Sequence, residues 1–280
     1  MNDALPLREA MDNGDAEALA RLLRDNPSLV RQTIQWGPQR CKIGPCAPVQ
    51  YLAQARFNAY ATHNRSHELT RLLLESGAPV NGLPGDGESP LITAASYHEI
   101  GVARALVEGG ADLESTGYAV PIGTALAHAV NFGAPEIVDL LVAAGARIRS
   151  LAEAAGAGLL PAGWRDSATA GDLGSALRAA AVCNRFGVID ELLAAGASID
   201  SQSDGGTALH WAAWEAKADS ARHLVQRGAN PLARDPKYNL TPLGWARHRA
   251  AECPSAHPDG GHARVIEFLE ERERLGPQSA

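Results

Sequence analysis

Residues 206–213, GTALHWAA, and residues 223–230, HLVQRGAN, decide the fold of this chain. In the first stretch Thr207 stands before a run of apolar residues, where its hydroxyl can cap a helix N-terminus. The second stretch ends a leucine-bearing segment with Gly228-Ala229. Gly readily adopts the left-handed conformation that ends a helix, so the two stretches predict a pair of short helices joined by a turn.

The same two markers recur along the chain. Five Gly-Ala pairs lie 33, 35, 51 and 32 residues apart, and a Ser/Thr-x-Leu marker stands 21 residues ahead of each of the last four. A constant internal gap with variable connections predicts rigid helix pairs that stack on one another. The Gly-Ala pairs begin at Gly77, Gly110, Gly145, Gly196 and Gly228, and the Ser/Thr markers are Ser89, Thr124, Ser175, Thr207 and Thr241.

Between the markers, the residue types fit the same interpretation. Each first helix carries small residues such as Ala94-Ala95 and Ala212-Ala213, which let neighbouring helices approach closely. Each second helix carries apolar residues at helical spacing, as at Val102 and Leu106.

This pattern resembles the ankyrin repeat family. The unit from Gly206 to Asn230 is similar to the family's Thr-Pro-Leu-His, Ala-Ala, Leu-Leu and Gly-Ala-Asp signature, and residues 89–113 and 124–148 match nearly as well. The resemblance covers roughly residues 5–270 and implies an all-α solenoid of about seven stacked helix-turn-helix units. We expect a single domain over residues 1–280, with units at about 5–30, 47–81, 87–115, 122–149, 150–172 (degenerate), 173–201, 205–233 and 239–272, and an irregular loop at 31–46.

Composition narrows the class of protein. The net charge of −7 and the absence of a Lys/Arg run argue against a nucleic-acid surface. No stretch approaches 18 apolar residues, so we expect no membrane span. Four irregularly spaced cysteines fit reduced thiols. We therefore expect a cytoplasmic monomer, and the Ala-, Gly- and Arg-rich usage suggests a bacterial source.

Two groups of residues contain side chains of the types that bind metals. Cys41 and Cys46, with His63 and His67 nearest in sequence, have the ligand types of a zinc site, but a buried or loop thiol is the simpler interpretation of the cysteines. The second group comprises Cys253, His257, Asp259 and His262. The family resemblance instead gives His262 a structural hydrogen bond to the backbone of a neighbouring repeat. We expect no metal and no cofactor.

The chain shows no pattern of catalytic residues. It has no Gly-x-Ser-x-Gly elbow and no glycine-rich loop ending in Gly-Lys-Ser/Thr. The resemblance implies that His210 joins adjacent repeats by hydrogen bonds. We expect a protein that is not an enzyme.

Aromatic residues give the best candidates for binding. Trp211 stands where the repeat pattern expects a buried Leu, so we expect it in the core. Trp214 occupies the variable position that, in the related family, often lines the concave face. Tyr97 and Phe132 hold the matching positions and would form an aromatic ladder with it, either as a binding stripe or as packing between repeats. Arg185 and Glu215 would supply a polar rim, and the turns offer Asp86, Glu88, Tyr118, Asp204, Lys237 and Tyr238.

We therefore expect a non-catalytic scaffold or adaptor that binds another protein through its concave face and inter-repeat turns. Two alternatives stay open at this point. One is an immunity- or antitoxin-like inhibitor or a secreted effector, whose acidic charge would suit a basic partner. The other is an enzyme or ligand sensor that uses the irregular segments at 31–46 and 150–172.

Overall fold

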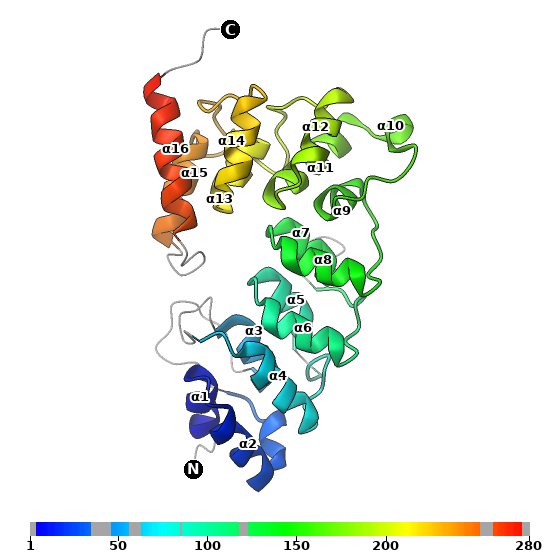
Figure 1. The fold of residues 1–280 in the computed structure, drawn as a ribbon, viewed down its shortest axis with the longest axis vertical. Coiled ribbons are helices and arrows are strands. Elements are labelled where there is room, and N and C mark those ends of the chain that lie inside the picture. Colours follow the sequence, from blue (N-terminus) through cyan, green and yellow to red (C-terminus); the bar gives the residue numbers. More distant parts are fainter. Residues whose placement is uncertain are drawn as a thin grey trace. The chain divides into compact units, whose positions relative to one another are not determined.

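The computed structural model describes residues 4–34, 46–55, 63–84, 86–117, 123–252 and 260–275. Over these ranges the chain is all-α, and its helices follow one another in antiparallel pairs joined by short turns (Figure 1). No strand forms there, and β-pairing is limited to isolated bridges. The protein is therefore a solenoid of helix-turn-helix repeats, as the spacing of the markers predicts.

The chain divides into two compact units. Unit 1 comprises residues 1–129 and 139–147. Its helices are α1 (Ala4–Asp12), α2 (Ala16–Asp25), the 3-10 helix η1 (Pro27–Arg31), α3 (Pro48–Ala55), α4 (Ser66–Glu75), α5 (Pro90–Ser96) and α6 (Ile100–Glu108). Helices α7 (Ala125–Asn131) and α8 (Pro135–Ala143) contribute residues to both units.

Unit 2 comprises residues 130–138 and 148–280. Its helices are α9 (Leu151–Ala157), α10 (Trp164–Ser167), α11 (Ala170–Val182), α12 (Phe186–Ala194), α13 (Ala208–Trp214), α14 (Ala218–Gln226), α15 (Pro242–Glu252) and α16 (Gly261–Leu275). All the cavities discussed below lie in this unit.

The Ser/Thr markers cap the first helices, with one exception. The hydroxyl of Thr207 accepts from the His210 N–H at 3.4 Å. The hydroxyls of Thr124 and Thr241 each accept, at 3.3 Å, from the backbone N–H three residues further along the chain. Ser175 does not cap a helix. Helix α11 begins earlier, at Ala170, because Thr169 and Asp172 form a complete capping box there. The helix therefore crosses the boundary expected between residues 172 and 173.

Each Gly-Ala pair ends its helix as expected. Gly110 and Gly228 have φ values of 79° and 96°, and the following Ala N–H donates to a carbonyl five residues back, as from Ala229 to Leu224. A side chain at this glycine would strain the backbone. The pairs thus fix where the second helices of five repeats end.

The core is formed by the small residues of the first helices and the large apolar residues of the second helices. Ala212 and Ala213 of α13 are fully buried, and so is Leu224 of α14. Close helix contacts at the alanines allow the leucines of the second helices to fill the space between layers. Histidines then join the layers: His210 Nε2 lies 3.1 Å from the Leu240 carbonyl and His262 Nε2 lies 3.0 Å from the Trp214 carbonyl. Both roles expected from the family resemblance are confirmed.

The middle of the chain departs from the regular repeat. Helix α9 is followed by only the one-turn helix α10, with Gly158 and Gly163 in the left-handed conformation between them. The extra residues expected near Phe57–Tyr60, and residues 35–45 of the irregular loop, lie outside the described ranges.

A further contact joins turns that are far apart in sequence. In unit 2 the Lys217 Nζ donates to the Gly133 carbonyl at 2.7 Å, across 84 residues. A Cβ at Gly133 would lie 2.8 Å from the Val182 carbonyl oxygen, so glycine at this position allows the turn to lie close to the Val182 backbone.

Candidate functional site

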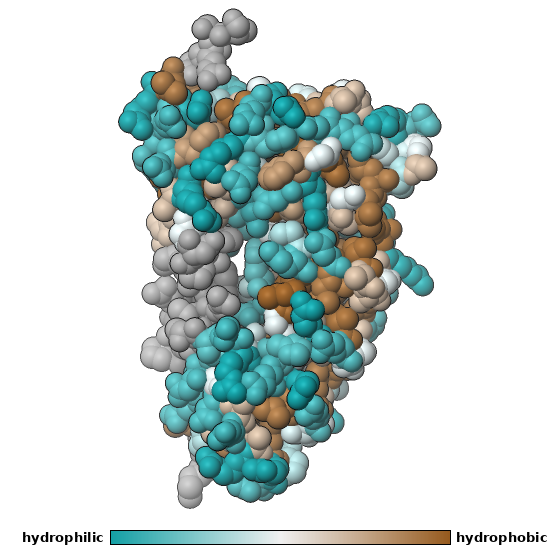
Figure 2. Space-filling model, in the orientation of Figure 1, coloured by the Kyte–Doolittle hydropathy of each residue, from teal (hydrophilic) through white to brown (hydrophobic). Residues whose placement is uncertain are grey.

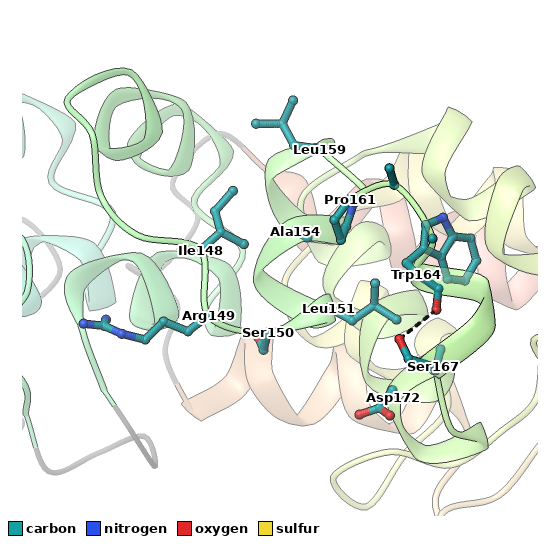
Figure 3. A pocket seen from close by; sticks show the side chains of 13 residues that line it. Ile148, Arg149, Ser150, Leu151, Ala154, Leu159, Pro161, Trp164, Ser167 and Asp172 are labelled. Carbon is teal, nitrogen blue, oxygen red and sulfur yellow. Dashed lines mark hydrogen bonds between the residues drawn. The ribbon is translucent and has the colours of Figure 1, made fainter.

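The irregular middle segment forms a cavity of about 670 Å³ (Figure 3). Ile148, Leu151, Leu159 and Pro161 surround it, and Trp164 closes one side. Leu159 is 53% exposed, and hydrophobic residues gather around α9 on the face drawn in Figure 2. The cavity is thus an open surface hollow with partly apolar walls.

The polar groups of this insert cavity already have structural roles. The Ser150 hydroxyl caps α9 and the Ser167 hydroxyl lies 3.5 Å from the Trp164 carbonyl. Asp172 belongs to the capping box of α11, and its hydrogen bonds with Thr169 lower the pKa of its carboxyl. Because these side chains are engaged in helix capping and in hydrogen bonds to the backbone, the described residues of the insert cavity form no reactive cluster.

A second cavity, of about 540 Å³, is lined mainly by aromatic residues. We call it the aromatic pocket. Its described lining residues are Asn131, Phe132, Trp211, Trp214, Glu215, Tyr238, Leu240, Trp245 and His248. They come from the end of α7, from α13, from the turn before α15, and from α15 itself. Three repeats therefore supply the wall, and the segment with α9 to α12, which lies between the first two of them in the chain, supplies no lining residue.

The three tryptophans pack edge to face. The Trp245 ring centroid lies 5.2 Å from that of Trp211 and 5.7 Å from that of Trp214, at interplanar angles of 83° and 74°. Such geometry is the favoured one for aromatic pairs. The Trp211 Nε1 donates to the Ser203 carbonyl at 3.0 Å and the Trp245 Nε1 donates to Asp235 at 3.0 Å. These contacts hold two of the three indoles in fixed positions.

Asp235 organises the turn that leads into α15. Its buried carboxylate accepts the N–H groups of Lys237, Tyr238 and Leu240 at 2.9, 2.6 and 2.9 Å, besides the indole of Trp245. Burial pushes the pKa of Asp235 upward, but these hydrogen bonds outweigh it and hold the pKa at about 2. The turn presents Tyr238 and Leu240, both exposed, to the pocket.

Glu215 is the one acidic residue among the described lining of the pocket. Its side chain is almost fully buried, and burial raises its pKa to about 7 against the attraction of Arg249, Lys217 and Arg178 for the carboxylate. The group therefore changes charge near neutral pH.

Cationic side chains lie over the outer aromatic rings. The Arg178 guanidinium is 5.0 Å from the Trp211 ring centroid, Arg249 is 5.0 Å from that of Trp214, and the Lys237 ammonium is 4.9 Å from that of Tyr238. Arg178 is itself buried, pairs with Asp204 at 3.2 Å and donates to Asn131 at 3.0 Å. Burial lowers its pKa, opposed by the nearby carboxylates.

Comparison with known families identifies the repeats. A family model described as "Ankyrin repeats (3 copies)" matches residues 58–152, and one described as "Ankyrin repeat" matches residues 204–236. The chain is an ankyrin repeat protein.

Solved ankyrin repeat domains resemble the chain over nearly its whole length. The human ASB11 ankyrin repeat domain is 24% identical, with 98% of this chain and 99% of that chain covered and a TM-score of 0.43. The ankyrin repeat domain of Bcl-3, a member of the IkappaB protein family, is 27% identical over 95% and 97%, with a TM-score of 0.41. Membership in the family rests on the repeat-level matches. A search of the curated proteins found no relative.

The pocket of this ankyrin repeat protein gathers four of the predicted binding residues. Its lining includes Phe132, Trp214, Glu215 and Tyr238. Asp204 forms an ion pair with Arg178, which lies beside the pocket. Glu215 was expected at an exposed polar rim, but the structure buries it because it lies between α13, α15 and Arg178.

The other predicted residues lie elsewhere. Tyr97 ends α5 in unit 1, and the Asp86 carboxylate accepts the Leu83 N–H at 2.6 Å in the same unit. Arg185 donates to the Gly156 carbonyl at 2.8 Å, so it joins α9 to α12 rather than lining the pocket. Tyr118 lies outside the described residues.

Trp211, Trp245, Leu240 and His248 were missed as site residues. Trp211 was expected in the core, which is wrong: it is half-buried and forms part of the pocket wall. Trp245 follows it by 34 residues, one repeat period. This spacing of one repeat was the sequence signal that could have placed Trp245 beside Trp211, because matching positions in neighbouring repeats stack side by side.

In the described part of the chain, the two groups of candidate metal ligands do not come together. His63 Nε2 lies 2.6 Å from the Met11 carbonyl, His67 pairs with Glu108 at 2.9 Å, and Cys46 is buried. Cys41, Cys253, His257 and Asp259 lie outside the described ranges. Among the described residues no group of three His, Cys, Asp or Glu could hold a metal, and none of the helices there is long and apolar enough to cross a membrane.

Proposed function

We propose that this ankyrin repeat protein is a non-catalytic adaptor whose aromatic pocket anchors a partner protein. Ankyrin repeats are generally modules for protein–protein interaction, which supports a binding role. The observation that carries the proposal is the gathering of five aromatic side chains around one cavity of about 540 Å³. Aromatic anchors in well-packed pockets supply most of the binding free energy at protein interfaces.

Exposure of apolar groups at the rim favours the same site. Tyr238 is 63% exposed and Leu240 is 36% exposed, and both border the aromatic pocket. A contiguous exposed apolar surface is typical of an interaction site. The wall is built from fixed helices and from a turn organised by Asp235, so little conformational entropy is lost when a partner docks.

We also propose that the protein acts in the cytoplasm. The four irregularly spaced cysteines of the sequence support a reducing compartment. The second candidate, an enzyme or sensor at the irregular middle segment, has the insert cavity in its favour. The structural roles of Ser150, Ser167 and Asp172 there weigh against catalysis.

A capture experiment tests the adaptor proposal. The wild type and a Trp214→Ala variant are used as baits in a lysate of the source cells, and bound proteins are compared by mass spectrometry. We expect a partner that the wild type retains and the variant loses. The matched control is Trp164→Phe, which alters a tryptophan of the insert cavity. Equal retention by all three baits would remove the pocket from the binding surface.

A further inference from the structure

The surface that the aromatic pocket presents to a partner is aromatic and apolar. Five aromatic rings and Leu240 supply most of its described lining. The Glu215 carboxyl is almost fully buried and is attracted by Arg249 and Lys217, so it is already engaged within the protein. A partner therefore meets mainly uncharged rings.

These rings favour a further aromatic ring as the occupant of the pocket. Trp245 packs edge to face against Trp211 and Trp214, the geometry in which aromatic rings attract one another. A ring from a partner gains the same attraction in addition to the burial of its apolar surface. The cavity of about 540 Å³ is within the range of ordinary ligand pockets and has room for one such ring.

Two polar groups of the lining are hydrogen-bond donors without an acceptor among the described residues. Trp211 and Trp245 use their indole N–H groups within the protein, whereas the Trp214 Nε1 donates to none of the described residues. The Asn131 side-chain oxygen accepts from Arg178 at 3.0 Å, and the amide N–H groups of Asn131 likewise find no acceptor there. A bound segment that supplies acceptor oxygens would satisfy both donors.

The charges around the pocket favour a negative partner. Three cationic side chains lie over rings of the lining, and Arg178 among them pairs with Asp204 at 3.2 Å. Lys237 is exposed and forms no ion pair with a described carboxylate, since Asp235 in the same turn accepts from four other groups. The ammonium group of Lys237 can therefore pair with a carboxylate of a partner, whereas a cation would be repelled.

We propose that the aromatic pocket binds an acidic segment of the partner protein. An aromatic side chain of the segment enters the cavity, carboxylates that flank it face Lys237, and acceptor oxygens of the segment meet the N–H groups of Trp214 and Asn131. This inference rests on the function proposed above and names the chemistry of the partner.

The net charge of −7 does not oppose this assignment. At physiological ionic strength, exposed charges separated by more than about 8 Å are largely screened from one another, so a bound segment responds mainly to the groups around the pocket. The cations there are Arg178, Arg249, Lys217 and Lys237, and the carboxylates are Asp204, Glu215 and Asp235. The surroundings of the pocket are thus less negative than the chain as a whole.

The test uses short synthetic peptides with a neutral fluorescent label and the full chain. The first peptide has phenylalanine flanked on both sides by aspartate and glutamate. The second has asparagine and glutamine as flanks, the third has lysine flanks, and the fourth has acidic flanks with alanine in place of phenylalanine. Binding is measured by fluorescence anisotropy at low and at physiological ionic strength.

The order of affinities reports both parts of the inference. At low salt we expect the acidic phenylalanine peptide to bind about fivefold more tightly than its neutral counterpart, and the lysine-flanked peptide to bind most weakly of these three. Added salt should reduce the advantage of the acidic flanks. The alanine peptide should bind at least about tenfold more weakly than the acidic phenylalanine peptide, because it lacks the ring that fills the cavity.

Variants locate the binding. Trp214→Leu removes the ring but keeps apolar bulk and should weaken binding of the acidic peptide at least about tenfold, whereas Trp214→Phe keeps a ring, loses the N–H donor and should weaken it about threefold. Lys237→Gln should reduce the advantage of acidic over neutral flanks to less than about twofold. The control Arg165→Gln removes an exposed cation beside the insert cavity and should bind as the wild type does. Circular dichroism checks that each variant keeps its helices.

Two outcomes would overturn the inference. If the neutral or the lysine-flanked peptide binds as tightly as the acidic one at low salt, the pocket does not select an acidic segment. If none of the peptides binds, if alanine replaces phenylalanine without loss, or if Trp214→Leu binds the acidic peptide unchanged, no aromatic side chain enters the cavity. Capture of a protein partner that depends on Trp214 is measured separately, so the inference can fail while the adaptor proposal stands.

Discussion

Replacing Glu215 by Gln is expected to stabilise the folded chain above pH 7 and to leave its stability unchanged below about pH 4.5. Burial raises the pKa of this carboxyl from its ordinary 4.5 to about 7. Gln resembles the protonated form in shape and is neutral at every pH, so the variant avoids the cost of a buried negative charge.

The magnitude follows from the pKa difference. One unit corresponds to about 1.4 kcal/mol, so the difference between 4.5 and about 7 gives about 3 kcal/mol. Below pH 4.5 both folded and unfolded wild-type chains hold the proton, and the variant has no advantage. Between pH 4.5 and 7 the unfolded chain loses its proton first, so the wild type loses stability relative to the variant as pH rises.

Urea unfolding monitored by circular dichroism between pH 4.5 and 8.5 measures this difference. The gap between the variant and the wild type should open with rising pH and level off above about pH 7. Glu191→Gln, at an exposed ion pair with Arg165, is the control and should show no such trend. A variant that is less stable than the wild type at pH 8 would show that Arg249, Lys217 and Arg178 stabilise an ionised Glu215, and the reasoning would be refuted.

Three further changes probe the fold and the pocket. Leu224→Ala, at a fully buried site, should lower the free energy of unfolding by about 2–5 kcal/mol in urea, whereas exposed Leu159→Ala should change it by less than about 0.5 kcal/mol. Asp235→Ala leaves four donors without their carboxylate, so we expect a lower melting temperature and weaker capture of the partner. The stability that Asp235 contributes should be present above its ordinary pKa of 3.8 and disappear as pH falls through about 2, which acid unfolding measures. Gly206→Ala would place a Cβ 2.9 Å from the Trp245 ring, so tryptophan fluorescence should shift, and an unchanged spectrum would argue against this packing.

The repeats could be predicted from the sequence because each depends on local signals. A capping hydroxyl such as Thr207 and a left-handed Gly such as Gly228 act within one helix turn of their own position. Ser175 failed as a cap for the same reason: the nearby Thr169 and Asp172 form a stronger local signal that starts the helix earlier.

The pocket could be predicted only in part, because stacking brings its residues together. Position within the repeat predicts that Trp214 and Phe132 lie on one face, and both line the pocket, yet it also predicts that Trp211 is buried in the core. Its exposure depends on which side chain the next repeat places opposite, which is Trp245 here. The burial of Glu215 likewise results from packing against α15, which no signal near Glu215 encodes.

The bond from Lys217 to the Gly133 carbonyl affects how unit 2 unfolds. In a simple repeat array each layer is coupled to its immediate neighbours, so a terminal layer can fray by itself. A tie that reaches from the turn after α13 to the turn after α7 couples helix pairs between which helices α9 to α12 lie in the chain. Opening of the α13 turn then releases an anchor outside the neighbouring helix pair, which lengthens the distance over which loss of structure is correlated. Amide hydrogen exchange in these two turns should therefore rise together.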